Sequence, residues 1–213
     1  MSAPDLSPRF AGPLRDAIRA RLGTLGPEPG IDGPPLRRAA VCLIVADDGE
    51  GAASLVLTLR PNHMARHANQ FAFPGGRLDE GETPLAAALR ETREEVGLVL
   101  GEDAILGRLH DFPTRSGYRI TPFVAWMPEG ATMNPNPDEV AEIFRVPFAE
   151  FSQPGSPEFV SIPESDRPVI RYPILGTKVH APTAAMAFQF IECAVHGRAT
   201  PVAHLEQPVW AWR

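Results

Sequence analysis

The spacing of apolar and polar residues along the chain predicts helices and strands in a definite order. Apolar residues fall on one helical face over 10–25 and over 83–98, and a third helix is predicted over 182–197. Two β-branched apolar runs, 39–47 and 54–60, flank the turn sequence DDGEG and predict a hairpin. The remaining expected elements are strands at 71–76, 104–112 and 118–127, a strand and a short helical turn over 138–151, and a hairpin of 158–162 with 169–175.

The order of these elements indicates the fold class. Strands and helices do not alternate regularly, which disfavours a doubly wound, Rossmann-type sheet. We expect a mixed α/β (α+β) fold with a mixed or antiparallel sheet, one helix in the middle of the chain and one near its end. We assign residues 1–36 to an N-terminal helix and a Pro/Gly-rich arm that pack as an appendage, and residues 37–213 to a single domain.

Composition narrows the class of protein. The 213 residues are 44% apolar and 22% charged, which is enough for a packed core, and 24 Pro with 18 Gly predict many loops. No apolar run reaches the roughly 18 residues that a membrane span needs, and the N-terminus lacks the apolar region of a secretory signal. The two cysteines, Cys42 and Cys193, form no motif, so a cytoplasmic location is expected. The net charge of −6 disfavours a nucleic-acid partner bound through a basic surface.

The chemistry-bearing residues are densest over 75–98, GGRLDEGETPLAAALRETREEVGL. Thr83 is expected to cap the helix in this stretch, and Gly97 is expected to end it. A helical wheel places one apolar face toward the core, formed by Leu85, Ala88, Leu89, Thr92 and Val96.

Three carboxylates, Glu91, Glu94 and Glu95, share the arc beside that apolar face. Like charges so close repel one another, and a cation among them relieves the repulsion. Mg²⁺ and Mn²⁺ prefer carboxylate and water oxygens, and a glycine turn such as Gly75-Gly76 lets backbone carbonyls approach the same ion. The plainer alternative is a solvated acidic face balanced by neighbouring arginines.

The spacing of this cluster resembles the Nudix box, the metal-binding loop–helix–loop of hydrolases that cleave nucleoside diphosphates linked to another moiety. Every charged and glycine position of the box is present over 76–98, namely Gly76, Glu82, Arg90, Glu91, Glu94, Glu95 and Gly97. Thr92 stands where an aliphatic residue is usual. The resemblance implies the Nudix α/β/α sandwich, with a mixed sheet between helices. It also implies hydrolysis of a pyrophosphate by a water activated by Mg²⁺ or Mn²⁺.

The same resemblance implies a role for each charged residue of the box. Glu91 and Glu95 would be the principal metal ligands, Glu94 would add to the metal cluster or orient water, and Gly76 would offer its carbonyl oxygen. Arg90 would hold the glutamates through ion pairs, with Glu82 as a structural partner.

Nudix enzymes often draw one more carboxylate from a later loop, as a base or a metal ligand. The segment 136–144, NPDEVAEIF, is the expected source of this group. Glu139 and Glu142 are its two candidates, and each has the alternative of being an ordinary surface charge.

The segment before the box, 57–76, resembles the signature that precedes it in coenzyme A pyrophosphatases. The positions in register are Leu57, Thr58, Arg60, Met64, His67, Gln70, Phe73, Pro74, Gly75 and Gly76. Ala65 and Asn69 depart from that signature, where arginine and glycine are usual, and Arg66 is displaced by one position. The implied substrate is coenzyme A or a thioester of it, cleaved to 3′,5′-ADP and a 4′-phosphopantetheine product.

Cationic and aromatic residues near the box are the candidate substrate contacts. Arginine binds phosphates bidentately, and an aromatic ring stacks on a base. The candidates are Arg60, Arg66, His67, Arg77, Arg115 and Tyr118. For His67, support of its own loop is an equal alternative.

Two other functions remain open at this stage. One is a Nudix pyrophosphatase for another small nucleotide, such as ADP-ribose, NADH or a dinucleoside polyphosphate, which the departures at Ala65 and Asn69 favour. The other is a non-catalytic nucleotide sensor on the same fold. The apolar residues Met186, Phe188, Phe190 and Ile191 of the C-terminal helix suit a core or a homodimer interface.

Overall fold

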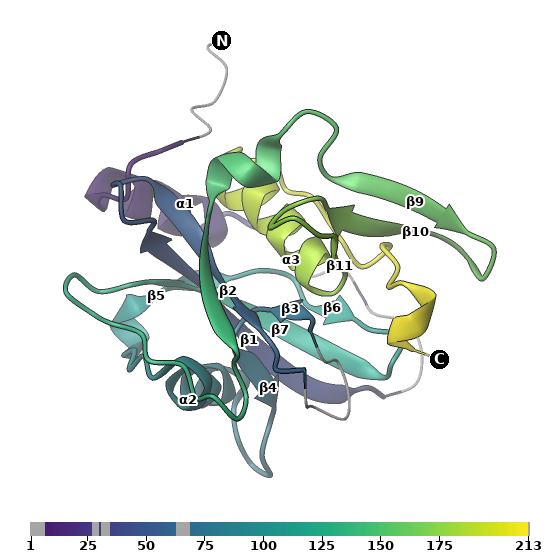
Figure 1. The fold of residues 1–213 in the computed structure, drawn as a ribbon, viewed down its shortest axis with the longest axis horizontal. Helices are drawn as coiled ribbons and strands as arrows, with labels where there is room; N and C mark the ends of the chain where they lie inside the picture. The colour runs from purple at the N-terminus through teal and green to yellow at the C-terminus, as the bar shows by residue number, and fades with distance from the viewer. Residues whose placement is uncertain (1–6, 27–29, 31–34, 63–68, 213) are drawn as a thin grey trace.

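The computed structural model describes residues 7–26, 30, 35–62 and 69–212, and its centre is an eight-stranded mixed sheet (Figure 1). In this sheet β1 (Arg37–Asp47) runs parallel to β7 (Tyr118–Trp126) and antiparallel to β2 (Ala53–Leu59). The other strands of the sheet are β3 (Phe71–Ala72), β4 (Gly75–Arg77), β5 (Ile105–Arg108), β6 (Phe112–Pro113) and β8 (Glu142–Pro147). The predicted mixed α/β fold is therefore confirmed.

Both faces of the sheet are covered by helices, as Figure 1 shows. Leu43 and Val45 of β1 belong to the core shared with α1 (Gly12–Gly23) and α3 (Thr183–Phe190), whereas Cys42 and Ile44 belong to the core beneath α2 (Pro84–Val96). Because both faces of β1 are buried, the strand is apolar almost throughout and does not alternate with polar residues. The result is the α/β/α sandwich.

The N-terminal helix α1 packs into the main core. Ile18 is fully buried and Leu22 nearly so, and both belong to the cluster that α3 also enters. Arg21 donates from Nη1 to the carbonyl oxygens of Ala194 (2.8 Å) and Val195 (2.7 Å), in the last turn of the C-terminal helix, where carbonyls need partners from outside the helix. These contacts fix α1 against the rest of the molecule.

The helix that carries the glutamates, α2, has the predicted ends. Thr83 accepts a hydrogen bond from the Ala86 N–H (3.2 Å), and Gly97 ends the helix with a left-handed φ of 66°. The predicted core face was partly wrong, because Leu85 and Leu89 are only half-buried while Ala87 and Glu95 are buried. The small side chain of Ala87 packs close to the sheet, and the Glu95 carboxylate finds a hydrogen bond there.

The chain after the large sheet forms a smaller unit over α3. The predicted hairpin is present as β9 (Glu158–Ile162) and β10 (Ser165–Tyr172), although β10 begins earlier than expected, and β11 (Val179–His180) adds a third strand. Helix α3 continues as a π-helical turn over Ile191–Val195, and short 3₁₀ turns lie at Glu102–Ala104, Phe148–Ser152 and Val209–Ala211.

The apolar residues of the C-terminal helix are mostly internal. Met186, Phe190 and Ile191 lie in the core of this same chain, and Phe188 is half-buried with its ring against Phe159. The helix itself therefore gives no support to the homodimer prediction, which stays a prediction. Within the part of the chain that the structure describes, no helix has the length and apolar character to cross a membrane.

Candidate active site

A cavity of about 520 Å³ lies between the second half of the glutamate helix, the glycine turn and the C-terminal segment. Side chains far apart in the sequence meet in it. Its charged lining residues are Arg60, Arg77, Asp79, Glu91, Glu95 and Glu139. Its other lining residues include Gly75, Gly76, Thr114, Ser116, Tyr118, Ile120, Ala181, Pro182, Thr183, Gln207 and Ala211.

Glu95 is the most deeply buried carboxylate of this cavity, with 4% of the residue exposed. The Gly75 N–H donates to its Oε2 at 3.0 Å, and Arg60 Nη1 lies 3.6 Å from its Oε1. Burial raises the pKa of Glu95 to about 7, against the opposing effects of the Gly75 hydrogen bond and the Arg60 charge. The negative charges of Glu91 and Glu139 add to the rise in this pKa.

Arg90 connects the other carboxylates of the helix. It donates to both oxygens of Glu82 (3.0 and 3.1 Å), to Glu91 (2.9 Å) and to Glu94 (3.0 Å). A further bond from Nη2 reaches the Arg77 carbonyl oxygen at 3.1 Å. These bonds, with that to Glu82 the strongest, raise the pKa of Arg90 and keep the guanidinium charged.

The three glutamates of the helix are placed differently. Glu91 and Glu95 line the cavity, whereas the Glu94 side chain is 44% exposed and its partners are Arg90 and Arg93. Burial raises the pKa of Glu91, and the charges of Glu94 and Glu139 act in the same direction. The structure thus brings two of the three predicted ligands into the cavity.

The loop after β7 supplies a further carboxylate to the cavity. The Asn136 N–H donates to the Glu95 carbonyl oxygen (2.9 Å), and the chain then turns so that Glu139 lines the cavity. Glu139 Oε2 is buried without a hydrogen-bond partner in the described structure. Glu142, the other candidate, is exposed at the start of β8 and does not line this cavity.

The donor set of the cavity fits a hard divalent cation. The charge of Glu139 raises the pKa of both Glu91 and Glu95, and its own Oε2, which has no hydrogen-bond partner in the described structure, is an oxygen ligand without a donor. Within the described ranges, no three acidic, His or Cys side chains are already grouped around one point. The N–H of Gly75 and the guanidinium of Arg90 engage oxygens of Glu95 and Glu91, so binding an ion requires these carboxylates to turn.

Gly76 lies directly against the Glu91 carboxylate. A Cβ at this position would lie 2.3 Å from Glu91 Oε1, whereas the backbone itself is not in the left-handed region. Glycine is therefore required here because the Glu91 carboxylate approaches so closely. The backbone itself sets no such requirement, since Gly76 pairs with Ala40 of β1 as an ordinary strand residue.

Gly76→Ala is expected to displace the Glu91 carboxylate and lower kcat by about 10- to 100-fold, because small misplacements of reacting groups are costly. The free energy of unfolding should change by less than about 1 kcal/mol, since the clash is with the end of a flexible side chain. Turnover assays and urea denaturation measure the two quantities. Gly23→Ala, where a Cβ meets nothing within 4 Å, is the control, and unchanged turnover in Gly76→Ala contradicts the prediction.

The predicted substrate residues are only partly brought together. Arg60, Arg77 and Tyr118 line the cavity, and the Tyr118 ring carries the guanidinium of Arg37 at 4.1 Å and that of Arg77 at 5.3 Å from its centroid. Arg66 and His67 lie outside the described residues.

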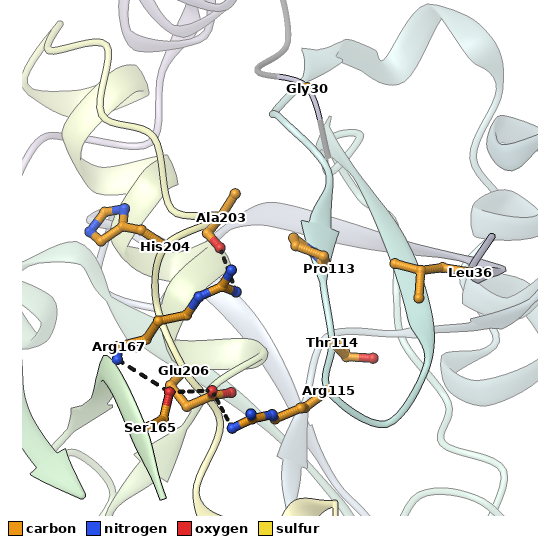
Figure 2. A pocket seen from close by; sticks show the side chains of 10 residues that line it. All are labelled: Gly30, Leu36, Pro113, Thr114, Arg115, Ser165, Arg167, Ala203, His204 and Glu206. Atoms are coloured by element: carbon orange, nitrogen blue, oxygen red, sulfur yellow. Dashed lines mark hydrogen bonds and ion pairs between the residues drawn. The ribbon is translucent and has the colours of Figure 1, made fainter. Parts of the chain in front are cut away.

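Arg115 does not line the cavity that holds the glutamates. Figure 2 shows it beside a neighbouring cavity of about 640 Å³, where its Nη1 contacts Glu206 Oε2 at 3.0 Å. Its guanidinium also lies 4.7 Å from the centroid of the Trp212 ring. The sequence prediction for Arg115 rested on the resemblance of 111–126 to a family segment that contributes to the pocket. Glu206, 91 positions away, instead binds the guanidinium.

Several lining residues were not anticipated from the sequence. Thr114 and Ser116 sit in the turn between β6 and β7, and Gln207 and Ala211 belong to a tail that the sequence describes only as irregular. No local pattern marks them, because they reach the cavity through long-range contacts.

Comparisons with known proteins identify the family. The NUDIX domain model matches residues 35–166. The Nudix hydrolase NudL of Yersinia enterocolitica is 37% identical over 125 residues, covering 58% of this chain and 63% of that protein. NudL of Yersinia pestis (strain Pestoides F) is 38% identical over 115 residues, covering 54% and 57%. The matched part therefore spans about six tenths of the length of these curated relatives.

Among solved structures, a MutT/nudix family protein from Enterococcus faecalis aligns with 81% of this chain and 64% of its own. The identity is 18% and the TM-score is 0.48. Nudix hydrolases generally use divalent metal ions and act on small nucleotides. Because the family model covers more than half of the sequence and includes the glutamate helix, the chain belongs to the NUDIX domain family.

Proposed function

We propose that this chain is a divalent-metal-dependent pyrophosphatase that hydrolyses coenzyme A or its thioesters to 3′,5′-ADP and a 4′-phosphopantetheine product. The observation that carries the proposal is the meeting of Glu91, Glu95 and Glu139 with Arg60 in one cavity. Mg²⁺ or Mn²⁺ is the expected cofactor. When bound by these carboxylates, the ion would neutralise the pyrophosphate and lower the pKa of an attacking water.

The protein groups themselves have separable roles in this scheme. Arg60 faces the carboxylates and would supply positive charge to a bound phosphate. Among the described residues its guanidinium pairs with Glu95 alone, and its Nε is buried without a hydrogen-bond partner. Glu139, with its free oxygen, is placed to accept a proton from water. Arg90 holds Glu91 in place from outside the cavity.

The coenzyme A assignment is supported by the backbone at Asn69. This residue has a left-handed φ of 55°, a conformation that glycine adopts freely and asparagine tolerates. The Asn69 N–H donates to the Arg60 carbonyl oxygen (3.1 Å), and the Arg60 N–H donates to the Gln70 carbonyl oxygen (3.0 Å). Asn69 thus adopts a conformation that suits the glycine usual at this position, so its departure from the signature does not argue against coenzyme A. Ala65 lies outside the described residues.

The substrate is tested with purified protein, Mg²⁺ or Mn²⁺, and a panel of coenzyme A, acetyl-coenzyme A, ADP-ribose, NADH and a dinucleoside polyphosphate. Release of 3′,5′-ADP from coenzyme A, well above the products of the other compounds, is the expected result. Preference for another compound would reject the coenzyme A assignment and retain the pyrophosphatase. A protein that binds these nucleotides and hydrolyses none of them would favour the sensor.

Glu139→Gln and Glu142→Gln separate the two candidate carboxylates. Loss of the Glu139 charge is expected to lower kcat by about 10²-fold or more, in the range of general base catalysis, whereas Glu142→Gln should leave kcat within about twofold. The two residues lie three positions apart and differ in their access to the cavity. Steady-state kinetics on the best substrate of the panel measure the effect, and equal kcat values for the two variants would reject the assignment of Glu139.

A further inference from the structure

The C-terminal segment forms part of the cavity wall. The match to the NUDIX domain model ends at residue 166, yet Pro182, Thr183, Gln207 and Ala211 all line the cavity that holds the carboxylates. The family region supplies the charged residues of the cavity, and the later segment supplies neutral ones. The later segment is thus placed to contact the part of a substrate that is not the pyrophosphate.

Gln207 is the one amide side chain of this later segment in the cavity lining, and its orientation is determined. The residue is 4% exposed, and its Oε1 accepts a hydrogen bond from the Arg115 backbone N–H at 2.8 Å. A backbone N–H can only donate, so the atom facing Arg115 must be the oxygen. The amide nitrogen Nε2 is then left with two N–H donors and no partner among the described residues.

A buried network holds Gln207 in this position, and Figure 2 shows its centre. Glu206, 4% exposed, accepts from Arg115 Nη1 (3.0 Å), from Ser165 Oγ (2.8 Å) and from the Gln207 N–H (3.0 Å). The Trp212 ring N–H donates to the Gln207 carbonyl oxygen at 3.4 Å. Both the backbone and the side-chain oxygen of Gln207 are therefore fixed before any ligand binds.

An amide N–H on a cavity-lining side chain that has no partner in the described structure is available to a ligand acceptor. The donor is uncharged, and the arginines of the cavity are the groups suited to phosphate. A neutral acceptor, such as a ring nitrogen of a base or an amide carbonyl, is the matching ligand group.

We propose that Gln207 is a specificity-determining residue that donates from Nε2 to a neutral acceptor on the non-phosphate part of a nucleotide substrate. This inference rests on the proposed function, because it takes the cavity to be the substrate site. It assigns the choice of substrate to a segment beyond the residues that match the family model.

Gln207→Met and Gln207→Glu test the proposal. Methionine keeps the length of the side chain without the donors, and glutamate keeps an oxygen for the Arg115 N–H while removing the donors. Both are expected to raise KM for the best substrate of the panel by about 5- to 30-fold, the value of one buried hydrogen bond. The change in kcat should be several-fold smaller, because Gln207 does not contact the reacting phosphorus.

Gln153→Met, which changes an exposed glutamine outside the cavity, is the matched control, and thermal denaturation verifies that all variants are folded. If the parent hydrolyses a nucleotide and folded Gln207→Met has the parental KM, the inference fails while the proposed function stands. If the parent hydrolyses none, the proposed function fails. The inference is then tested by calorimetric binding of 3′,5′-ADP and ADP-ribose, where an unchanged Kd in Gln207→Met overturns it.

Discussion

Glu95→Gln is expected to lower kcat for pyrophosphate hydrolysis by about 10³-fold, equivalent to several kcal/mol of transition-state stabilisation. The substitution keeps the size of the side chain and an oxygen that can accept from the Gly75 N–H, but it removes a buried negative charge. Glu95 is the most deeply buried of the carboxylates that line the cavity. Steady-state kinetics with saturating Mg²⁺ or Mn²⁺ measure the loss, and turnover equal to that of the parent would show that the carboxylate does not serve the reaction.

The same variant is expected to stabilise the fold when no metal is bound. The pKa of Glu95 is about 7 in the folded chain, against 4.5 for an ordinary glutamate, so the fold disfavours the ionised form. Above pH 7 the parent bears this cost in full, on the order of 1–3 kcal/mol, and Glu95→Gln does not. Urea denaturation at pH 8 with a chelator present should therefore give a larger free energy of unfolding for the variant.

The pH dependence of this difference identifies its cause. Because the pKa of Glu95 is raised, the free-energy cost of its ionisation in the fold grows as pH rises from about 4.5 to about 7. The gain in unfolding free energy of Glu95→Gln should therefore shrink at pH 5 and vanish below 4.5. Glu142→Gln, a change at an exposed carboxylate, should show no such pH-dependent gain. An advantage of equal size at pH 5 and pH 8 would show that packing, and not charge, accounts for the change.

Local signals in the sequence were sufficient for the glutamate helix. Thr83 and Gly97 define its ends through contacts within one turn. The continuous apolar run of β1 likewise accounts for the burial of both faces of that strand. The placement of Glu95 was harder to foresee, since a helical wheel treats a carboxylate as solvent-facing. Its burial depends on a hydrogen bond from Gly75, which belongs to another element of the fold.

Contacts between distant segments account for what the sequence did not reveal. Glu139 and Glu142 lie in one short segment, yet only Glu139 lines the cavity. Backbone hydrogen bonds to distant elements hold this segment, from Asn136 to the end of α2 and from Ala141 to Leu59 of β2. Arg115 was expected at the substrate, but a buried carboxylate in the tail binds it. Gln207 has no local pattern at all, because its role depends on the packing of that tail against the turn after β6.

Arg90→Met is expected to lower the free energy of unfolding by about 2–4 kcal/mol at pH 8. The change leaves two largely shielded carboxylates, Glu82 with 14% and Glu91 with 18% of the side chain exposed, without their guanidinium partner. Removing one partner of a fully buried ion pair costs about 3–5 kcal/mol, and the partial exposure of these carboxylates reduces that cost. Kinetic assays should also show a large loss of kcat, because Glu91 loses the contact that holds it beside Gly76.

Arg93→Met is the matched control for this prediction. Arg93 lies on the same helix, its side chain is 62% exposed, and its one described ion pair, with Glu94, is 3.8 Å long, so its loss should cost less than about 0.5 kcal/mol. Arg90 holds the pKa of Glu82 below its ordinary value, and without Arg90 that carboxylate protonates more readily. The gap between parent and Arg90→Met should therefore be full above about pH 5 and narrow as pH falls from about 5 toward about 3. A gap that stays constant over this range would mean that Arg90 stabilises the helix through packing of its alkyl chain, and that the glutamates are held in place by other contacts.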